Sequence, residues 1–334
     1  MSPKDHILLG ITMGDPAGIG PEIAAKVLSG GQLPPHSGAF VIGDARVMER
    51  ATRIVGSPKR VCSLSSPGTM DAGAINVLDM PGFLPEIFPA GGPSAECGRA
   101  SYEYILKGIE LATAGTIDAV VTNPISKEAL AMAGIQYPGH TEIFAEETGA
   151  KDYAMVFFLE NVAVAHVTTH CSLRQAIERI TVERVHTAIT LLHNALVAMG
   201  IESPRIAVGG LNPHAGEHGL FGTEEEQHIV PAVVRAAEQG IRATGPLPPD
   251  TVFMRAFKGE FDGVVAMLHD HGFVALKSRD FGKGVNITIG LPIIRTSVGH
   301  GTAFDLASTG KADEASLVEA IRVAASLASS RLAS

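Results

Sequence analysis

The chain has 334 residues, of which 46% are hydrophobic and 18% are charged, so it can fold around a sizeable core. Its formal net charge of −9 excludes the broad basic surface that general nucleic-acid binders carry. The most apolar segment, residues 153–169, is interrupted by Glu160 and Asn161 and is too short and too polar to span a membrane. Three cysteines without CxxC spacing and an N-terminus without a secretory signal predict a cytoplasmic protein.

Short apolar segments alternate with helical patterns along most of the chain. The segments with strand character are 6–12, 39–44, 74–79, 118–124, 153–158, 161–169, 205–210, 262–268 and 284–290. The segments with helical periodicity are 21–30, 101–115, 125–134, 173–199, 223–240 and 313–332. Two Pro- and Gly-rich stretches, 80–93 and 244–250, predict loops. This alternation predicts an α/β protein whose helices cover a mostly parallel sheet.

The glycine-rich segment 14–22 follows the first predicted strand. Its glycines fit neither GxGxxG nor GxxxxGK[ST], so neither nucleotide-binding motif is present there. Pro21 and Glu22 mark the start of a helix. That helix start either holds an anion with its free N–H groups or is only a tight strand-to-helix turn.

Histidines follow three of the predicted strands, at the ends where open α/β sheets bind ligands. They are His170, His214 and His269. Histidine is the commonest transition-metal ligand, and catalytic divalent sites usually have three protein ligands, so the three predict one metal site. The alternative is that each histidine only caps its strand. His166 lies about 13 Å from His170 along an extended strand, too far to share a metal, and is predicted to be structural.

A second group of residues has the chemistry to bind an anion. His140 and Thr141 precede a helical pattern, where free N–H groups favour a phosphate, although Thr141 could merely cap the helix. Lys277, Asn286 and Arg295 supply two cations and an amide after the third histidine. Such groups hold phosphates or carboxylates.

Six motifs carry a family resemblance. They are ITMGDPAGIGPEI, YPGHTE, VTTHCSLRQA, GLNPHAGEHGLFG, MLHDHGFVALK and GVNITIGLPIIRTSVGHGTAFDLA. In this order, over about residues 8–325, the chain resembles the 4-hydroxythreonine-4-phosphate dehydrogenase family of pyridoxal phosphate biosynthesis. The resemblance implies a bilobal three-layer α/β/α fold like those of isocitrate and isopropylmalate dehydrogenases, with the active site in the interlobe cleft. One lobe would comprise residues 1–123 and 296–334, and the central lobe, with the dimer interface, residues 124–295.

The resemblance also implies an activity. It is the NAD-dependent, metal-dependent oxidation of 4-(phosphooxy)threonine with decarboxylation to 3-amino-2-oxopropyl phosphate, in a homodimer with shared active sites. NADP is the alternative to NAD, and zinc, magnesium, cobalt and manganese are the candidate metals. Paralogues on this scaffold act on 4-phospho-D-threonate, 4-phospho-D-erythronate or another hydroxy acid. A non-catalytic metabolite sensor is the remote alternative.

Through its motifs the resemblance implies roles for single residues. The implied metal ligands are His170, His214 and His269. The implied substrate-binding residues are His140, Thr141, Lys277, Asn286, Arg295 and Asp250, and Asp250 would reach the neighbouring subunit's site. Apart from the resemblance, the candidate catalytic residues are Lys277, as a base, and Asp270, which would orient a ligand histidine.

Two positions depart from the family pattern. His271 stands where the family has Gln, and Gly299 stands where it has Asp. Both positions lie within site motifs, so they bear on substrate choice. The general base stays open at this point between Lys277, His271 and a metal-bound hydroxide.

Overall fold

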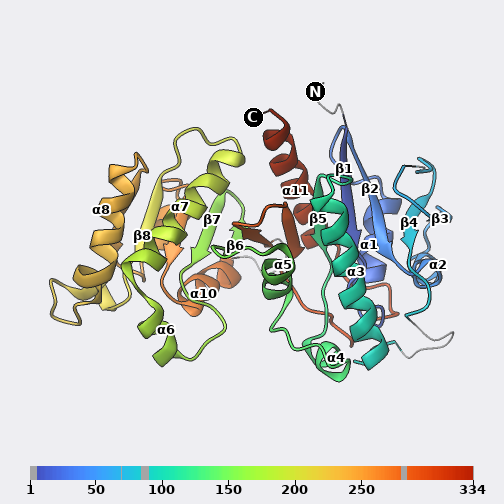
Figure 1. The fold of residues 1–334 in the computed structure, drawn as a ribbon, viewed down its shortest axis with the longest axis horizontal. Coiled ribbons are helices and arrows are strands. Elements are labelled where there is room, and N and C mark those ends of the chain that lie inside the picture. Colours follow the sequence, from blue (N-terminus) through green and yellow to red (C-terminus); the bar gives the residue numbers. More distant parts are fainter. Residues whose placement is uncertain (1–5, 69, 84–89, 280–283, 334) are drawn as a thin grey trace. The chain divides into compact units, whose positions relative to one another are not determined.

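The computed structural model describes residues 6–68, 70–83, 90–279 and 284–333 of the chain. The chain divides into two compact units, residues 1–150 with 291–334 and residues 151–290 (Figure 1). We call them unit 1 and unit 2. The motif-based division expects residues 124–150 and 291–295 in the central lobe, whereas the structure groups both segments with unit 1. One reason is that α4 (Lys127–Met132) and α5 (His140–Thr148) pack against α3 (Ala95–Thr113).

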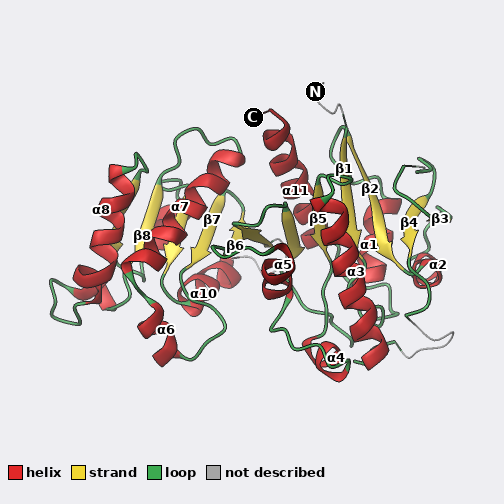
Figure 2. Cartoon of the chain, in the orientation of Figure 1, coloured by secondary structure: helices red, strands yellow, loops and turns green. Residues whose placement is uncertain are grey.

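Unit 1 contains a parallel sheet with helices on both faces (Figure 2). In spatial order its strands are β3 (Val61–Leu64), β4 (Ile75–Asp79), β2 (Ser37–Gly43), β1 (Ile7–Thr12), β5 (Ala119–Thr122) and β12 (Arg295–Val298). Its other helices are α1 (Gly20–Ser29), α2 (Ala45–Ile54) and α11 (Ala315–Ala333). α3 covers one face, whereas α11 covers the other and contacts α1 (Figure 1). Burial on both faces explains why these strands read as continuous apolar runs.

Unit 2 contains a mixed sheet. In spatial order its strands are β11 (Val285–Ile289), β6 (Ala154–Leu159), β7 (Val162–His166), β10 (Gly263–Ala266), β8 (Ile206–Gly209) and β9 (Ala243–Leu247). The strands from β7 to β9 are parallel, and β6 is antiparallel to both of its neighbours. Its helices are α6 (Leu173–Arg179), α7 (Val182–Ala198), α8 (Val230–Glu238), α9 (Val252–Phe257) and α10 (His269–Arg279), with the short turns η1 (Pro213–Gly216) and η2 (Glu225–Ile229).

The central strand β10 is covered on both faces because alternate residues of a strand point in opposite directions. A Cβ added to Gly263 would lie 2.9–3.0 Å from Leu192 and Leu196 of α7. The next residue, Val264, and Ala266 belong instead to an apolar core that contains residues of α9 and α10. In Figure 1, α7 runs across the front of this sheet. Helices on both faces of each sheet confirm the predicted α/β class.

Two predictions about single elements are wrong. The helix predicted over residues 173–199 is two helices, because the Thr181 hydroxyl accepts the Arg184 N–H and starts a new one. The loop predicted over residues 244–250 contains most of β9, an edge strand that tolerates Pro246 despite its missing N–H. The loop predicted over residues 80–93 lies partly outside the described residues. Among the helices that the structure describes, none is long and apolar enough to cross a membrane.

The turn between β1 and α1 buries a carboxyl group. Asp15 is fully buried, and its Oδ1 accepts the Ala17 N–H at 2.9 Å. Burial raises the pKa of Asp15 from 3.8 to about 6, and the Ala17 hydrogen bond opposes part of that rise. The carboxylate of Glu22, in the first turn of α1, accepts the backbone N–H groups of Ser308 and Gly310. The segment is therefore a tight strand-to-helix turn.

We expect Asp15→Asn to stabilise the protein at pH 8 relative to wild type and to lose that advantage at pH 4. A raised folded-state pKa means that the Asp15 contribution to stability is complete below pH 4 and is lost as pH rises through 6. The pH-dependent part of the gain corresponds to about 2–3 kcal/mol. Urea unfolding of both proteins between pH 4 and pH 8 measures it. If the difference in unfolding free energy between the two proteins does not change with pH, the raised pKa of Asp15 is contradicted.

Candidate active site

The parallel strands β7, β10 and β8 end at one edge of the unit 2 sheet. Their register pairs Ala266, the last residue of β10, with His166, the last residue of β7. Just beyond these ends, the Thr168 hydroxyl donates to the Met267 carbonyl at 2.7 Å. The loops that follow β7 and β10 therefore leave the sheet side by side, and they carry His170 and His269.

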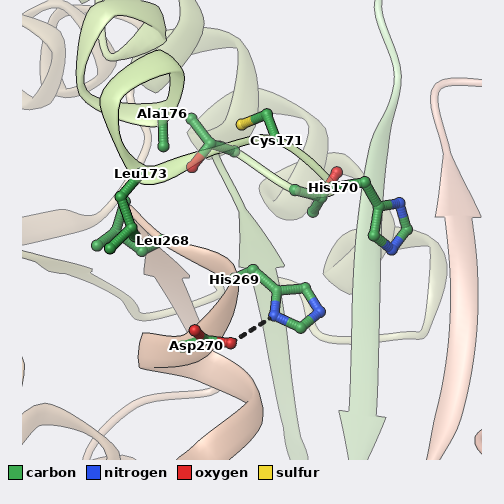
Figure 3. A pocket seen from close by; sticks show the side chains of 9 residues that line it. His170, Cys171, Leu173, Ala176, Leu268, His269 and Asp270 are labelled. Atoms are coloured by element: carbon green, nitrogen blue, oxygen red, sulfur yellow. Dashed lines mark hydrogen bonds and ion pairs between the residues drawn. The ribbon is translucent and has the colours of Figure 1, made fainter.

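His170 and His269 lie next to each other in a pocket of about 270 Å³ (Figure 3). Their ring centroids are 5.9 Å apart. The Nδ1 of His269 donates to the Asp270 carboxylate at 2.8 Å, which leaves its Nε2 for another partner. This carboxylate–histidine contact is the arrangement that usually orients a metal-bound histidine.

Phe273 lies at the centre of a cluster of rings. Its ring centroid is 4.5 Å from that of His269 and 4.8 Å from that of His166, on which it stacks. The Nζ of Lys277 is 5.2 Å from the same centroid. His269, Phe273 and Lys277 are four residues apart and share one face of α10. The sequence analysis did not single out Phe273. Its spacing of four residues from both His269 and Lys277 is the signal that could have identified it.

His166 is buried at the end of β7. Its side chain is 1% exposed, and burial lowers its pKa to about 3, with a further lowering from the charge of His269. Its ring centroid is 6.2 Å from that of His269, because β7 ends at His166 and the chain then bends. The separation of about 13 Å expected between His166 and His170 assumes one extended strand, which is wrong because β7 ends at His166, so the structural role of His166 stays a prediction.

His214 lies in a different pocket of about 280 Å³, in the loop after β8. Its ring centroid is 6.3 Å from that of Phe221. His170 and His214 both have left-handed backbone conformations, with φ of 38° and 53°, which are uncommon for residues other than glycine. Within the described residues, no three His, Cys, Asp or Glu side chains are arranged to hold a metal ion. The three-histidine site therefore stays a prediction.

Asp250 lines an open groove of about 770 Å³ together with Asp270 and His271. Asp250 is exposed and directly precedes Thr251, the N-cap residue of α9, which makes no side-chain capping hydrogen bond. Burial lowers the pKa of His271, and the charge of Asp270 opposes that effect. Asn286 lies on β11, where it is half-buried.

In unit 1, His140 is the first residue of α5. The helix has Gly139 as its N-cap without a side-chain hydrogen bond, so Thr141 lies in the first turn and is not the cap. The Nε2 of His140 is buried and has no hydrogen-bond partner. Burial lowers the pKa of His140 well below 6.5, and the charge of Arg295 lowers it further. The first turn of α5 thus presents an uncapped helix start beside a neutral imidazole.

Arg295, the first residue of β12, is 3% exposed. It donates to the Thr122 hydroxyl at 2.8 Å, and its guanidinium carbon is 5.4 Å from the ring centroid of Phe144 in α5. Burial lowers its pKa to about 9, although Glu142 opposes the shift, so the guanidinium is charged at neutral pH. A buried cation at a helix N-terminus is an environment that favours an anion. Gly299, further along, donates its N–H to the Ser316 hydroxyl.

Nearly the whole chain matches a protein family, curated proteins and solved structures. The family described as "Pyridoxal phosphate biosynthetic protein PdxA" matches residues 36–324. A 4-hydroxythreonine-4-phosphate dehydrogenase of Beijerinckia indica is 49% identical, covering 97% of this chain and 95% of that protein. A D-threonate 4-phosphate dehydrogenase of Cupriavidus necator is 46% identical, covering 97% and 98%. The crystal structure of a 4-hydroxythreonine-4-phosphate dehydrogenase from Burkholderia phymatum superimposes with a TM-score of 0.83 at 46% identity, covering 96% and 98%.

A more distant structure agrees in fold alone. It is a β-decarboxylating dehydrogenase from Thermococcus kodakarensis, with a TM-score of 0.50 at 13% identity, covering 96% of this chain and 82% of that one. This likeness supports the predicted relation to the fold of decarboxylating dehydrogenases.

Proposed function

Because the chain belongs to the PdxA family of pyridoxal phosphate biosynthetic proteins, we propose that it oxidises a 4-phosphorylated four-carbon hydroxy acid and releases CO2. The first candidate substrate is 4-(phosphooxy)threonine, which would yield 3-amino-2-oxopropyl phosphate. The second is D-threonate 4-phosphate, because relatives of nearly equal identity carry that name. The two acids differ at the second carbon, which bears an amino group or a hydroxyl group.

The observation that carries this proposal is the pair of histidines, His170 and His269, at the end of parallel strands. We assign the metal to these two and to His214, which follows β8, the next strand at that edge. Two adjacent imidazoles, one of them oriented by Asp270, are donors of the kind that zinc accepts. A bound divalent metal supplies the Lewis acid for alcohol oxidation and for the charge that develops as CO2 leaves.

The substrate's anionic groups are assigned to two sets of residues. In unit 1, His140, Thr141 and Arg295 would bind the phosphate, because the α5 N-terminus and a buried guanidinium favour an anion. In unit 2, Lys277 and Asn286 would bind the remaining polar groups.

Lys277 shares a face of α10 with His269 and is our candidate for the base that takes the hydroxyl proton, with His271 as the alternative. The hydride acceptor would be NAD, with NADP the alternative, as expected of a dehydrogenase.

Turnover with a panel of 4-phosphorylated four-carbon acids tests the proposal. With added divalent metal, we expect NAD reduction with at least one of the two candidate acids and much weaker reaction with its dephosphorylated form. Arg295→Lys should raise KM for the phosphorylated acid roughly tenfold to a hundredfold, because charge-assisted hydrogen bonds are lost. Arg322→Lys, at an exposed arginine paired with Glu319, is the control. A protein that binds these acids but turns none over would instead be a metabolite sensor.

The metal assignment predicts the behaviour of single histidine variants. His170→Ala, His214→Ala and His269→Ala should each lose most bound zinc and most activity while keeping the fold. His218→Ala is a matched control, because His218 lies in the same loop as His214 and is likewise exposed. Metal content after dialysis against zinc, measured by mass spectrometry, is the readout. Full zinc content in His214→Ala would show that the trio is wrong.

We also propose that the protein is a homodimer in which Asp250 serves the partner's site. The groove that Asp250 lines has an apolar floor that includes Phe253 and Phe257. Met254 and Val274 border it and are 52% and 65% exposed. Exposed apolar side chains around a groove are typical of a surface that another protein covers. Closed two-fold pairs are the commonest oligomers, so a second copy is the proposed occupant.

Subunit mixing tests this arrangement. His170→Ala and Asp250→Ala should each be inactive, but after exchange a mixed dimer has one site with both changes and one with neither. Equal mixing should then restore about a quarter of the wild-type specific activity, because half of the dimers are mixed and each has one intact site. No recovery after exchange has been verified by mass spectrometry would mean that Asp250 acts within its own chain.

A further inference from the structure

The loop that carries His214 has an unusual backbone. Six successive residues, His214 to Gly219, have positive φ values of 53°, 54°, 82°, 44°, 57° and 86°. Only Gly216 and Gly219 among them lack a Cβ, so the other four adopt a conformation that L-residues rarely take. Such a run persists only where surrounding contacts hold it.

A buried carboxylate holds the residues just before this run. Glu225, the first residue of η2, is 3% exposed. Its Oε1 accepts the backbone N–H groups of Leu211 and Asn212, both at 2.7 Å. Its Oε2 accepts the side-chain amide of Asn212 at 2.9 Å. Three N–H donors thus converge on one carboxylate, two residues before His214.

The chain also closes around this carboxylate from the other side. A Cβ added to Gly216 would lie 2.8 Å from the Glu225 Oε2, and one added to Gly210 would lie 3.1 Å from its Oε1. Gly216 therefore approaches the Glu225 carboxylate more closely than a residue with a Cβ could, and Gly210 approaches it tightly. Glu225 is the group around which the loop is wrapped.

We propose that Glu225 is the positioning residue for His214, and that it fixes the metal affinity of the site through the loop backbone. This inference rests on the proposed role of His214 as a metal ligand. Glu225 would not contact the metal itself, because it is 3% exposed and its carboxylate faces N–H groups of the loop. The sequence signal was only a run of three acidic residues, 224–226, in which nothing distinguishes the middle one.

The test compares Glu225→Gln with Glu226→Gln, which removes the neighbouring exposed carboxylate. Glu225→Gln keeps the side-chain shape but turns an NH2 group toward an N–H donor. We expect Zn²⁺ affinity, measured by chelator competition, to fall roughly tenfold to a hundredfold. The visible spectrum of the Co²⁺-loaded protein should change, and the Leu211 and Asn212 amides should exchange hydrogen faster. Glu226→Gln should match wild type in all three measurements.

Two results would overturn the inference, and they are distinguishable. If His214→Ala keeps wild-type Zn²⁺ affinity, the proposed ligand set is wrong and the inference falls with it. If His214→Ala loses Zn²⁺ while Glu225→Gln matches Glu226→Gln, the ligand set stands and Glu225 is not its positioning residue. Should Glu225→Gln fail to fold, Glu225→Asp keeps the charge but shortens the side chain, and its Zn²⁺ affinity and Co²⁺ spectrum decide the same question.

Discussion

Parallel pairing of β7, β10 and β8 is the constraint on which the rest of the candidate site depends. Parallel strands of similar register end at one edge of a sheet, so the loops that follow them must share that edge. His170 and His269 meet there although they are far apart in the chain. The backbone accommodates this by left-handed residues at His170 and His214, a conformation that clusters at functional sites.

Two buried charged groups, Arg295 and Glu225, differ in the neighbours that surround them. Arg295 is buried beside the Thr122 hydroxyl and the Phe144 ring, and burial lowers its pKa although the charge of Glu142 opposes the shift. An anion bound beside it would offset that cost. Glu225 is the opposite case, because three N–H donors surround its carboxylate. Arg295 is therefore suited to bind an anion, and Glu225 is suited to position the loop that carries His214.

Local sequence signals predicted elements well where period and chemistry agree. The predicted strands 118–124 and 262–268 became β5 and β10, each trimmed at its ends. The local signals gave wrong elements where a single side chain decides where a helix begins. The Thr181 cap divides one predicted helix into two. Periodicity cannot show such breaks, because both sides of the break keep the apolar pattern.

The sequence by itself determined the α/β class, the family, and the residue types that can bind a metal and an anion. These follow from local periodicity and from motifs of a few residues each. Only the tertiary structure decided which histidines lie side by side, and that Arg295, His140 and Glu225 are surrounded rather than solvated. The reason is physical. Burial and pairing depend on residues that are distant in sequence, such as Thr122, 173 positions before Arg295, and no local pattern records those contacts.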